Sequence, residues 1–284
     1  MVAACLSDVV EQVSTWYPPG YAAGWDRVGC VLGDPRQAVH RVLLAVDPVP
    51  QVAAEALRCR ADLVLAHHPL FLHGVHALTD DIPGAAVART LIKAGIALLT
   101  VHTNADVAPD GVNDALAAAL GLTEISVLLP EPERGEGVGM GRVGLLPSPL
   151  APAALGRWVA DRLPATAAGV RVAIPPTAER SPVGRVAVLA GAGDSLLDAI
   201  APGVADAVIT SDCRHHRVLD AVLVRGLCVV DVAHAAAEAP WLPMLAERLR
   251  GEAGRRDWAL DVVVSGERSD PWSLHVPAIR WEQQ

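Results

Sequence analysis

The chain has 284 residues, a formal net charge of -9 at pH 7 and 52% hydrophobic residues. This length allows one large domain or two lobes with sizeable cores. The acidic balance, without any Lys/Arg-rich block, disfavours nucleic acid as a main partner. No apolar run reaches the ~18 residues that a membrane span requires, so we expect no membrane partner.

The cysteine content and the first residues of the chain indicate in which cellular compartment the protein is found. Five cysteines are present, an odd number without any C-x-x-C spacing. This pattern favours reduced thiols in a cytosol over a disulfide framework or a thiolate zinc site. The first residues lack the basic start and the long apolar region of a signal peptide. We therefore expect a cytoplasmic protein.

The first half of the chain alternates predicted strands and helices. In chain order these are a helix at 6–16, strands at 30–33 and 41–46, a helix at 50–60, a strand at 62–66, a helix at 83–94, a strand at 96–101 and a helix at 112–120. Such an alternation is the signature of a mostly parallel sheet with crossover helices.

A stretch rich in proline, glutamate and glycine, residues 130–141, follows and is interpreted as a linker between two lobes. Beyond it, strands are predicted at 142–146, 170–174, 186–189, 207–209, 227–232 and 260–264, with helices at 151–163, 194–200, 215–225 and 241–250. We therefore predict an α/β protein with two similar lobes and mixed, mostly parallel sheets. Residues 1–129 would form the first lobe and residues 142–284 the second.

One glycine-rich turn, Gly191-Ala192-Gly193-Asp194, invites comparison with a phosphate-binding loop. It lacks both the full G-x-G-x-x-G pattern and the Lys-Ser/Thr of a P-loop. We interpret it as a tight turn from a strand into a helix.

Three predicted strands stop at residue types that commonly bind metals. The residues that follow these strands are His67 and His68, then His102 and Asp106, then His234 and Glu238. In open α/β sheets the carboxyl ends of strands are where ligands bind. Surface histidines and carboxylates that stabilise helix starts would explain one such coincidence, but three of them favour a metal site.

The residue types at these strand ends restrict the metal. Imidazole and carboxylate together suit divalent zinc, manganese, iron, cobalt or nickel. A set with several imidazoles and two carboxylates exceeds what one tetrahedral zinc needs. It suits two ions ~3.5–4 Å apart, the usual arrangement for hydrolysis. His234 and Glu238 are four residues apart at a predicted helix start, so they can share one face.

These motifs resemble those of the Nif-three-like family, whose bacterial members are often labelled GTP cyclohydrolase 1 type 2 homologues. The resemblance covers nearly the whole chain, in the right order. The segments that carry it are residues 66–70, 102–106 and 233–238, Trp25-Asp26 with Gly29, and Thr210-Ser211-Asp212 with His215-His216. It implies two α/β lobes with a dinuclear metal centre in the cleft between them, assembled as a homohexamer.

The resemblance also implies roles for single residues. The metal ligands would be His67, His68, Asp106, His234 and Glu238. His102 would lie near the metals rather than among their ligands, and we expect His102 or His215 to move protons. For His215 and His216, binding of a substrate phosphate and a surface role at a helix start stay open. Glu238 is the candidate for a carboxylate that bridges both ions, since a shared negative charge offsets the repulsion between two dications.

The last motif departs from the family pattern at two positions. The family commonly has an aromatic residue after the histidine and Ser or Thr before the glutamate, where this chain has Ala235 and Ala237. The ligand spacing is kept, but a stacking surface and a hydroxyl are lost. Metal binding is therefore better supported than any inherited substrate preference.

The resulting functional prediction is a metal-dependent hydrolase with two divalent ions per chain and a small-molecule substrate such as a nucleotide. By resemblance, the reaction would be the hydrolytic opening of the guanine imidazole ring of GTP, with release of formate. Two alternatives stay open. One is phosphoester or amide hydrolysis at the same centre, and the other is a non-catalytic metal-binding or regulatory protein.

Overall fold

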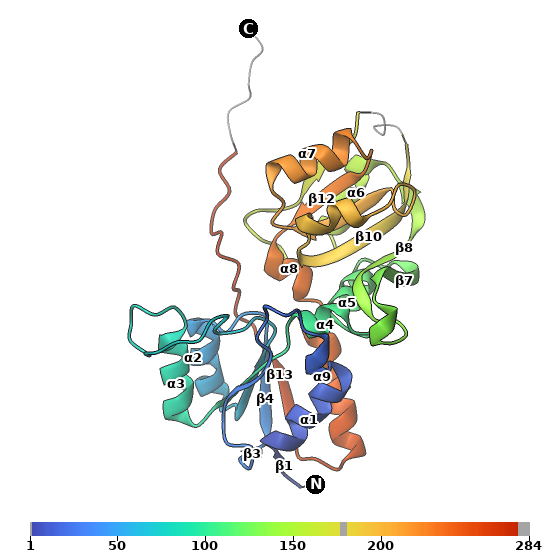
Figure 1. Ribbon diagram of the computed structural model, residues 1–284. Coiled ribbons are helices and arrows are strands. Elements are labelled where there is room, and N and C mark those ends of the chain that lie inside the picture. The colour runs from blue at the N-terminus through green and yellow to red at the C-terminus, as the bar shows by residue number, and fades with distance from the viewer. Residues whose placement is uncertain (1, 177–180, 278–284) are drawn as a thin grey trace.

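Two lobes are stacked end to end in the computed structural model, which describes residues 2–176 and 181–277 (Figure 1). Each lobe is built on one large sheet covered by helices, and each sheet contains both parallel and antiparallel neighbours. The predicted α/β fold with mixed sheets is therefore confirmed.

The sheet of the first lobe has the strand order β13-β4-β5-β6-β2. The strands are β2 (Gly29–Leu32), β4 (Arg41–Ala45), β5 (Leu63–Ala66), β6 (Ala97–Thr100) and β13 (Asp261–Val264). All neighbours are parallel except β2, which pairs antiparallel with β6. The central strands are almost continuously apolar because helices cover both of their faces. A separate two-stranded sheet joins β1 (Ala4–Cys5) to β3 (Ala38–Val39).

Helices cover both faces of this first sheet. They are α1 (Leu6–Trp16) and α9 (Trp241–Arg255) on one side, and α2 (Pro50–Cys59) and α3 (Ala85–Ala94) on the other. Figure 1 shows β4 between the two helix pairs. Successive side chains of a strand point to opposite faces, so Leu44 packs with α1 and α9 while Leu43 packs with α2 and α3.

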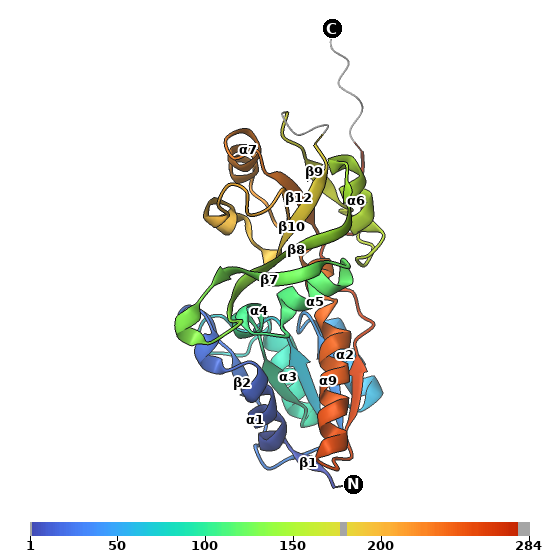
Figure 2. The same cartoon turned by 90° about the vertical axis from the view of Figure 1, so that its right-hand side faces the viewer.

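The sheet of the second lobe has the order β7-β8-β10-β11-β12-β9. Its strands are β7 (Thr123–Pro130), β8 (Gly139–Leu150), β9 (Arg171–Ala173), β10 (Val183–Ala192), β11 (Ala207–Ser211) and β12 (Cys228–Val232). The three strands β10, β11 and β12 are parallel, and the other neighbours are antiparallel. Figure 2 shows this sheet edge-on above the first lobe.

The second sheet also lies between two layers. The helices α5 (Val112–Ala119) and α6 (Pro152–Ala160) cover one face, and the short helix η3 (Asp194–Ala199) and α7 (His215–Leu223) cover the other. The Gly191 turn leads from β10 into η3, as the sequence predicted. Further short helices are η1 (Pro19–Tyr21), α4 (Thr103–Val107) and η2 (Pro132–Arg134).

The chain passes between the lobes twice, and the predicted lobe boundaries are wrong at both places. The strand β7 begins at Thr123 and pairs with β8, so residues 131–138 connect a hairpin of the second sheet and do not link the lobes. After β12 the chain returns through α8 (His234–Glu238), and both α9 and β13 join the first lobe. Residues 278–284 of the predicted second lobe lie outside the described residues.

These boundaries could not be predicted from the sequence, for two physical reasons. Most residues of β7 are exposed, so the strand has no clear apolar alternation. The apolar face of α9 could cover either sheet, and only tertiary packing decides between them. Within residues 2–176 and 181–277, no helix is both long and apolar enough to cross a membrane.

The packing of α9 predicts a large effect for Trp241→Ala. Trp241 is fully buried, packs edge-on against Tyr17 at 5.7 Å between ring centroids, and donates Nε1–H to the Tyr17 hydroxyl at 3.2 Å. Removing this side chain should lower the free energy of unfolding by about 3–5 kcal/mol, measured by urea denaturation. The matched control Trp272→Ala removes a ring that is 68% exposed and should change it by about 0.5 kcal/mol or less. Equal effects would contradict the placement of α9 in the first-lobe core.

Candidate metal centre

The register of the first sheet brings three functional side chains together. Ala45, Ala66 and Thr100 lie in one row across β4, β5 and β6. Two residues beyond this row, the strands present Asp47, His68 and His102, respectively. Because these parallel strands end at the same edge of the sheet, the pairing itself places the three side chains side by side.

The second lobe contributes through the ends of β11 and β12. Ser211 and Val232 are paired, so Asp212 and the start of α8 emerge together. Within α8 the spacing of four residues puts His234 Nε2 2.9 Å from Glu238 Oε1. The helix α8 packs on β10 and α5, and this position directs Glu238 toward the ends of the first-lobe strands.

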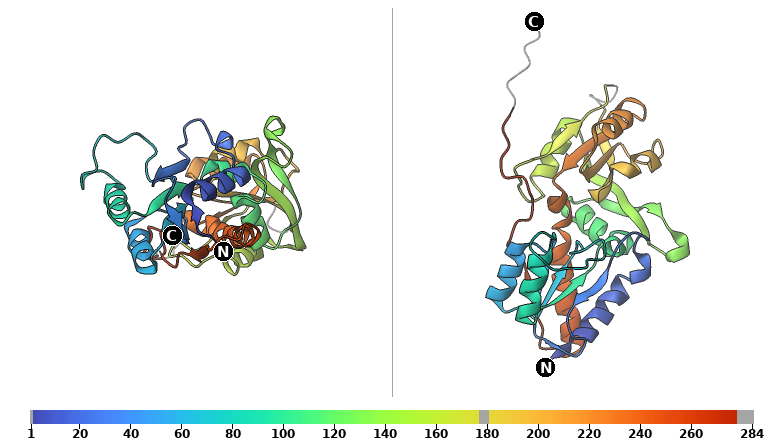
Figure 3. Two further views of the ribbon diagram at one scale, coloured as in Figure 1. Left: turned by 90° about the horizontal axis from the view of Figure 1, so that it is seen from below. Right: turned by 60° about the vertical axis from the view of Figure 1, so that its left-hand side comes forward.

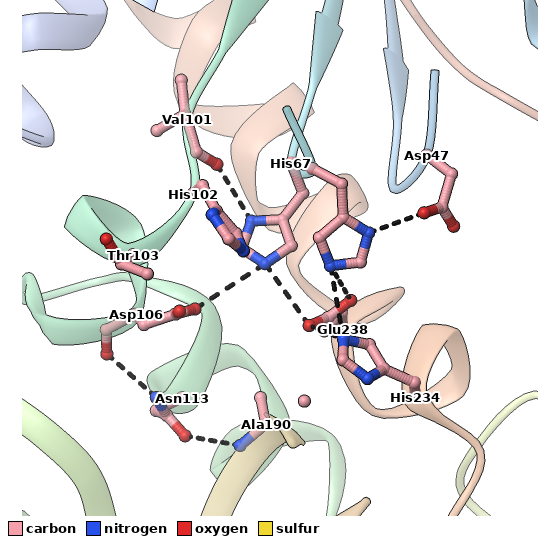
Figure 4. A network of polar contacts seen from close by, with 12 residues as sticks. Asp47, His67, Val101, His102, Thr103, Asp106, Asn113, Ala190, His234 and Glu238 are labelled. Atoms are coloured by element: carbon pink, nitrogen blue, oxygen red, sulfur yellow. Dashed lines mark hydrogen bonds and ion pairs between the residues drawn. The ribbon is translucent and has the colours of Figure 1, made fainter. Parts of the chain in front are cut away.

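Asp106 is held at the same place by a contact between the lobes. It lies on α4, which directly follows β6. Asn113, fully buried on α5, donates to the Asp106 carbonyl oxygen at 2.9 Å. The Asn113 side-chain oxygen accepts from Ala190 N on β10 at 2.8 Å (Figure 4). The Asn113 side chain therefore connects α4, which carries Asp106, to the second sheet.

Glu238 lies at the centre of the cluster, with only 3% of its surface exposed. Its Oε1 is 3.4 Å from His67 Nε2, and its Oε2 is 3.3 Å from His68 Nε2 (Figure 4). His67 Nε2 is also 3.7 Å from Asp106 Oδ1. All five residues expected as ligands therefore converge, although the sequence separates them widely.

Each of four histidines has its Nδ1 bound to an acceptor. The acceptors are the Val101 carbonyl for His67 at 2.9 Å, Asp47 for His68 at 2.6 Å, Asp26 for His102 at 2.9 Å and Asp212 for His234 at 2.6 Å. An acceptor at Nδ1 fixes the tautomer and leaves Nε2 free for a metal. The sequence did not predict these roles for Asp47 and Asp212. The shared spacing after paired strands is the signal that could have found them.

Several buried atoms of the cluster have no hydrogen-bond partner in the part of the chain that the structure describes. They are His67 Nε2, Asp106 Oδ1 and Glu238 Oε2. Buried polar atoms are rarely left unpaired, and a metal ion would satisfy all three. Two groups have ligand atoms within 4.8 Å of one another: His67, His68 and His102, and His68, His234 and Glu238. This set of nitrogen and oxygen donors fits first-row divalent metals.

Comparison with known proteins agrees with the motifs and the fold. Residues 4–271 match the family described as Duf34/NIF3 (NGG1p interacting factor 3). The chain belongs to this family. The resemblance inferred from the motifs is therefore confirmed.

Relatives of this Duf34/NIF3 protein cover almost its whole length. A protein of Streptomyces coelicolor named GTP cyclohydrolase 1 type 2 homolog is 45% identical over 95% of this chain and 94% of its own. A protein of the same name from Nostoc is 34% identical over 86% of this chain and 91% of its own. The solved Bacillus cereus protein related to NIF3 has a TM-score of 0.88 at 22% identity, covering 97% of this chain and 100% of that one, and so shows the same fold.

The pKa values of the ionisable side chains in this Duf34/NIF3 centre depend on burial and on their contacts with one another. Burial alone would lower the pKa of His68, but its hydrogen bond to Asp47 and the nearby Glu238 carboxylate, 3.3 Å from Nε2, raise it to about 10. The pKa of His234 is likewise raised to about 9, mainly by Glu238. Burial raises the pKa of Asp106 to about 6. Burial also opposes ionisation of Glu238, yet the surrounding histidines hold its pKa well below the usual range.

A cavity of ≈ 790 Å³ opens beside the cluster. His68, Asp212 and His234 line it from the side of the metal-type residues, and Arg171 and residues 269–272, 274 and 275 line other parts. This volume suits a small molecule.

His215 lies apart from the cluster. It is exposed at the start of α7, packs edge-on against His216 at 5.1 Å between ring centroids, and lines a second cavity of ≈ 450 Å³. Its expected role in proton transfer stays a prediction.

The raised pKa values predict that metal binding releases protons. In the metal-free protein His68 and His234 are protonated at neutral pH, and a metal must displace these protons from Nε2. Affinity should therefore rise with pH, by roughly tenfold per pH unit for each proton displaced. Titrating metal-free protein with zinc between pH 6 and 8 measures this slope. An affinity that does not change over this range would contradict the charge states described above.

The backbone of Gly191 predicts a second effect on metal binding. A Cβ there would lie 2.7 Å from Glu238 Oε1 and 3.2 Å from His234 Nε2, and φ is +71°. Gly191→Ala should therefore displace both side chains and reduce the metal content per chain after dialysis, measured by mass spectrometry. Gly226→Ala is the matched control, since φ is +66° and no heavy atom lies within 4 Å of the added Cβ. It should carry similar backbone strain of about 1–2 kcal/mol and keep its metal. Equal metal loss in both variants would show that backbone strain is the cause.

Proposed function

We propose that this protein is a metal-dependent hydrolase of a small molecule, with two divalent ions between its lobes. One observation carries the proposal. Three histidines, His67, His68 and His234, are each held at Nδ1 and turn Nε2 toward the carboxylates of Glu238 and Asp106, which include atoms without a hydrogen-bond partner among the described residues; a cavity of ≈ 790 Å³ lies beside them. Fixed tautomers, buried carboxylates and an adjacent cavity are what a hydrolytic metal site requires.

The two ions would share Glu238. One position would be held by His67, Asp106 and Glu238, and the other by His68, His234 and Glu238. The distances of Glu238 Oε1 and Oε2 to histidines of both sets support a bridging role. When bound, such ions supply Lewis acidity and lower the pKa of water.

The chain itself supplies orientation and exclusion of water. The carbonyl of Val101 and the carboxylate of Asp47 hold the rings of His67 and His68. His67 is fully buried, so one side of the centre is closed to solvent. Substrate would approach from the cavity, where His68 and His234 are partly exposed.

His102 is the better placed of the two histidines expected to move protons. Its ring centroid is 5.1 Å from that of His67 and 5.3 Å from that of His68. Asp26 accepts its Nδ1–H and is itself held by Thr103 through both N–H and Oγ1–H. Asp26 would stabilise the imidazolium if His102 took a proton at Nε2.

The substrate proposed first is GTP, because the Streptomyces and Nostoc relatives are named as GTP cyclohydrolase 1 type 2 homologs. One water would add to the carbon between the two imidazole nitrogens of guanine and open the ring to a formamide, and a second water would hydrolyse the formamide to formate and an amine. The expected homohexamer also stays a prediction, which light scattering at micromolar concentration would test.

The test is formate release from GTP by the metal-loaded protein, with Glu238→Gln as the key variant. The amide cannot carry the shared negative charge, so the variant should lose at least one ion and bind the other roughly 100-fold more weakly. Formate release should disappear with the metal. Glu252→Gln is the matched control, because Glu252 is also buried but pairs with Arg255 and Arg256 on α9.

The possible outcomes separate the alternatives. Two ions per chain in Glu238→Gln would contradict the bridging role. Full metal content without formate, but with hydrolysis of a phosphoester or an amide, would replace the cyclohydrolase by another hydrolase. Full metal content without turnover of any of these substrates would favour a metal-binding or regulatory protein.

A further inference from the structure

The residues after β13 form an extended segment that we call the C-terminal strap, residues 265–277. It leaves the first lobe and runs up beside the second lobe (Figure 3). Near its start it is fixed to α2, where Ser265 Oγ–H and Gly266 N–H donate to Glu55. Residues 265–270, 272 and 273 of the strap and residues 164–167 of the second lobe line one cavity of ≈ 500 Å³. The strap therefore lies against both lobes.

One contact of the strap reaches the metal-type cluster. Ser269 Oγ–H donates to Asp47 Oδ2, and Asp47 Oδ1 accepts His68 Nδ1–H at 2.6 Å. His68 Nε2 in turn lies 3.3 Å from Glu238 Oε2. Two successive hydrogen bonds therefore connect the strap to His68 Nδ1, on the side of the ring opposite to Nε2, which faces Glu238.

The histidines of the cluster differ in how their acceptors are held. The acceptor for His67 is a backbone carbonyl, and Asp26, the acceptor for His102, has additional bonds from Thr103 and from Arg27 N–H. Across residues 2–176 and 181–277, the hydrogen bonds of the Asp47 carboxylate come from His68 and Ser269. The χ2 torsion of aspartate is broad and roughly two-fold, so Ser269 is what fixes the Asp47 carboxylate in the orientation that His68 uses.

We infer that Ser269 is a positioning residue for the metal position that contains His68, and that it couples the strap to this position. The inference rests on the dinuclear centre proposed above. The strap also lines the ≈ 790 Å³ cavity through residues 269–272, 274 and 275, and His68 and His234 line the same cavity. The strap would therefore both enclose a molecule in this cavity and orient His68.

The test is cobalt binding to metal-free Ser269→Ala. Without the hydroxyl the Asp47 carboxylate can rotate, and the His68 ring loses its fixed direction. One of the two cobalt ions should bind about 3- to 10-fold more weakly. This effect is smaller than the roughly 10- to 100-fold loss expected when a group bonded directly to a metal ligand is removed, because Ser269 acts through Asp47. The visible absorption bands of the bound cobalt should change as well, because they depend on ligand geometry.

Two further variants isolate the cause. Ser269→Thr keeps the hydroxyl and should restore both the affinity and the spectrum. Ser265→Ala is the matched control, because it removes another serine–carboxylate bond of the same strap, to Glu55, which has no link to His68. This control should bind both cobalt ions as the wild-type protein does. Thermal unfolding of each variant verifies that the chain is folded.

Ser269→Ala with wild-type cobalt affinity and spectrum would overturn the inference. So would an equal change in Ser265→Ala, since it would show a general loosening of the strap. A wild-type protein that binds no cobalt would overturn both the inference and the proposed function. A protein that binds two ions, responds to Ser269→Ala and hydrolyses nothing would contradict the proposed function alone.

Discussion

The structure depends on one buried carboxylate. Glu238 is 3% exposed and lies among the rings of His67, His68 and His234. A buried charge is costly unless it is paired, so Glu238 is tolerable only while the first lobe presents its histidines to α8. The pairing of Glu238 with these histidines therefore holds the two lobes together. Asn113 adds a second contact at the same place, since it donates to the Asp106 carbonyl oxygen and accepts from Ala190 N.

Much of the site could be predicted because its residues follow strands that are recognisable from their apolar runs. The residues that converge were identifiable as candidates, together with His102, since a strand end is a local feature and parallel strands end at a common edge. The family resemblance, not the strand pattern, separated the five expected ligands from His102. The role of Asp47 was not visible locally. It depends on the pairing of Ala45 with Ala66, which places the residue two positions after β4 beside the one two positions after β5. Ser269 was still less visible, because it reaches Asp47 across 222 positions of the sequence.

The fold class could be predicted, whereas the lobe boundaries could not. A helix such as α9 has an apolar face that fits any sheet of suitable twist, and its choice of the first lobe rests on contacts such as those of Trp241 with Tyr17. The exposed strand β7 lacks the alternation that identifies a half-buried strand. In both cases the deciding interactions join residues far apart in the chain, and no local pattern contains them.

The path of the chain couples the proposed metal centre to the relative position of the two lobes. His234 and Glu238 lie on α8, which is the connection between the second sheet and α9 of the first lobe. Any rotation of one lobe against the other must move α8 relative to His67 and His68. Ions that bound only the arrangement seen here would stabilise it by mass action, and the stabilisation would grow with the logarithm of the ratio of ion concentration to Kd. The strap from β13 spans the same junction, so occupation of the proposed centre would act on both the second crossing and the strap.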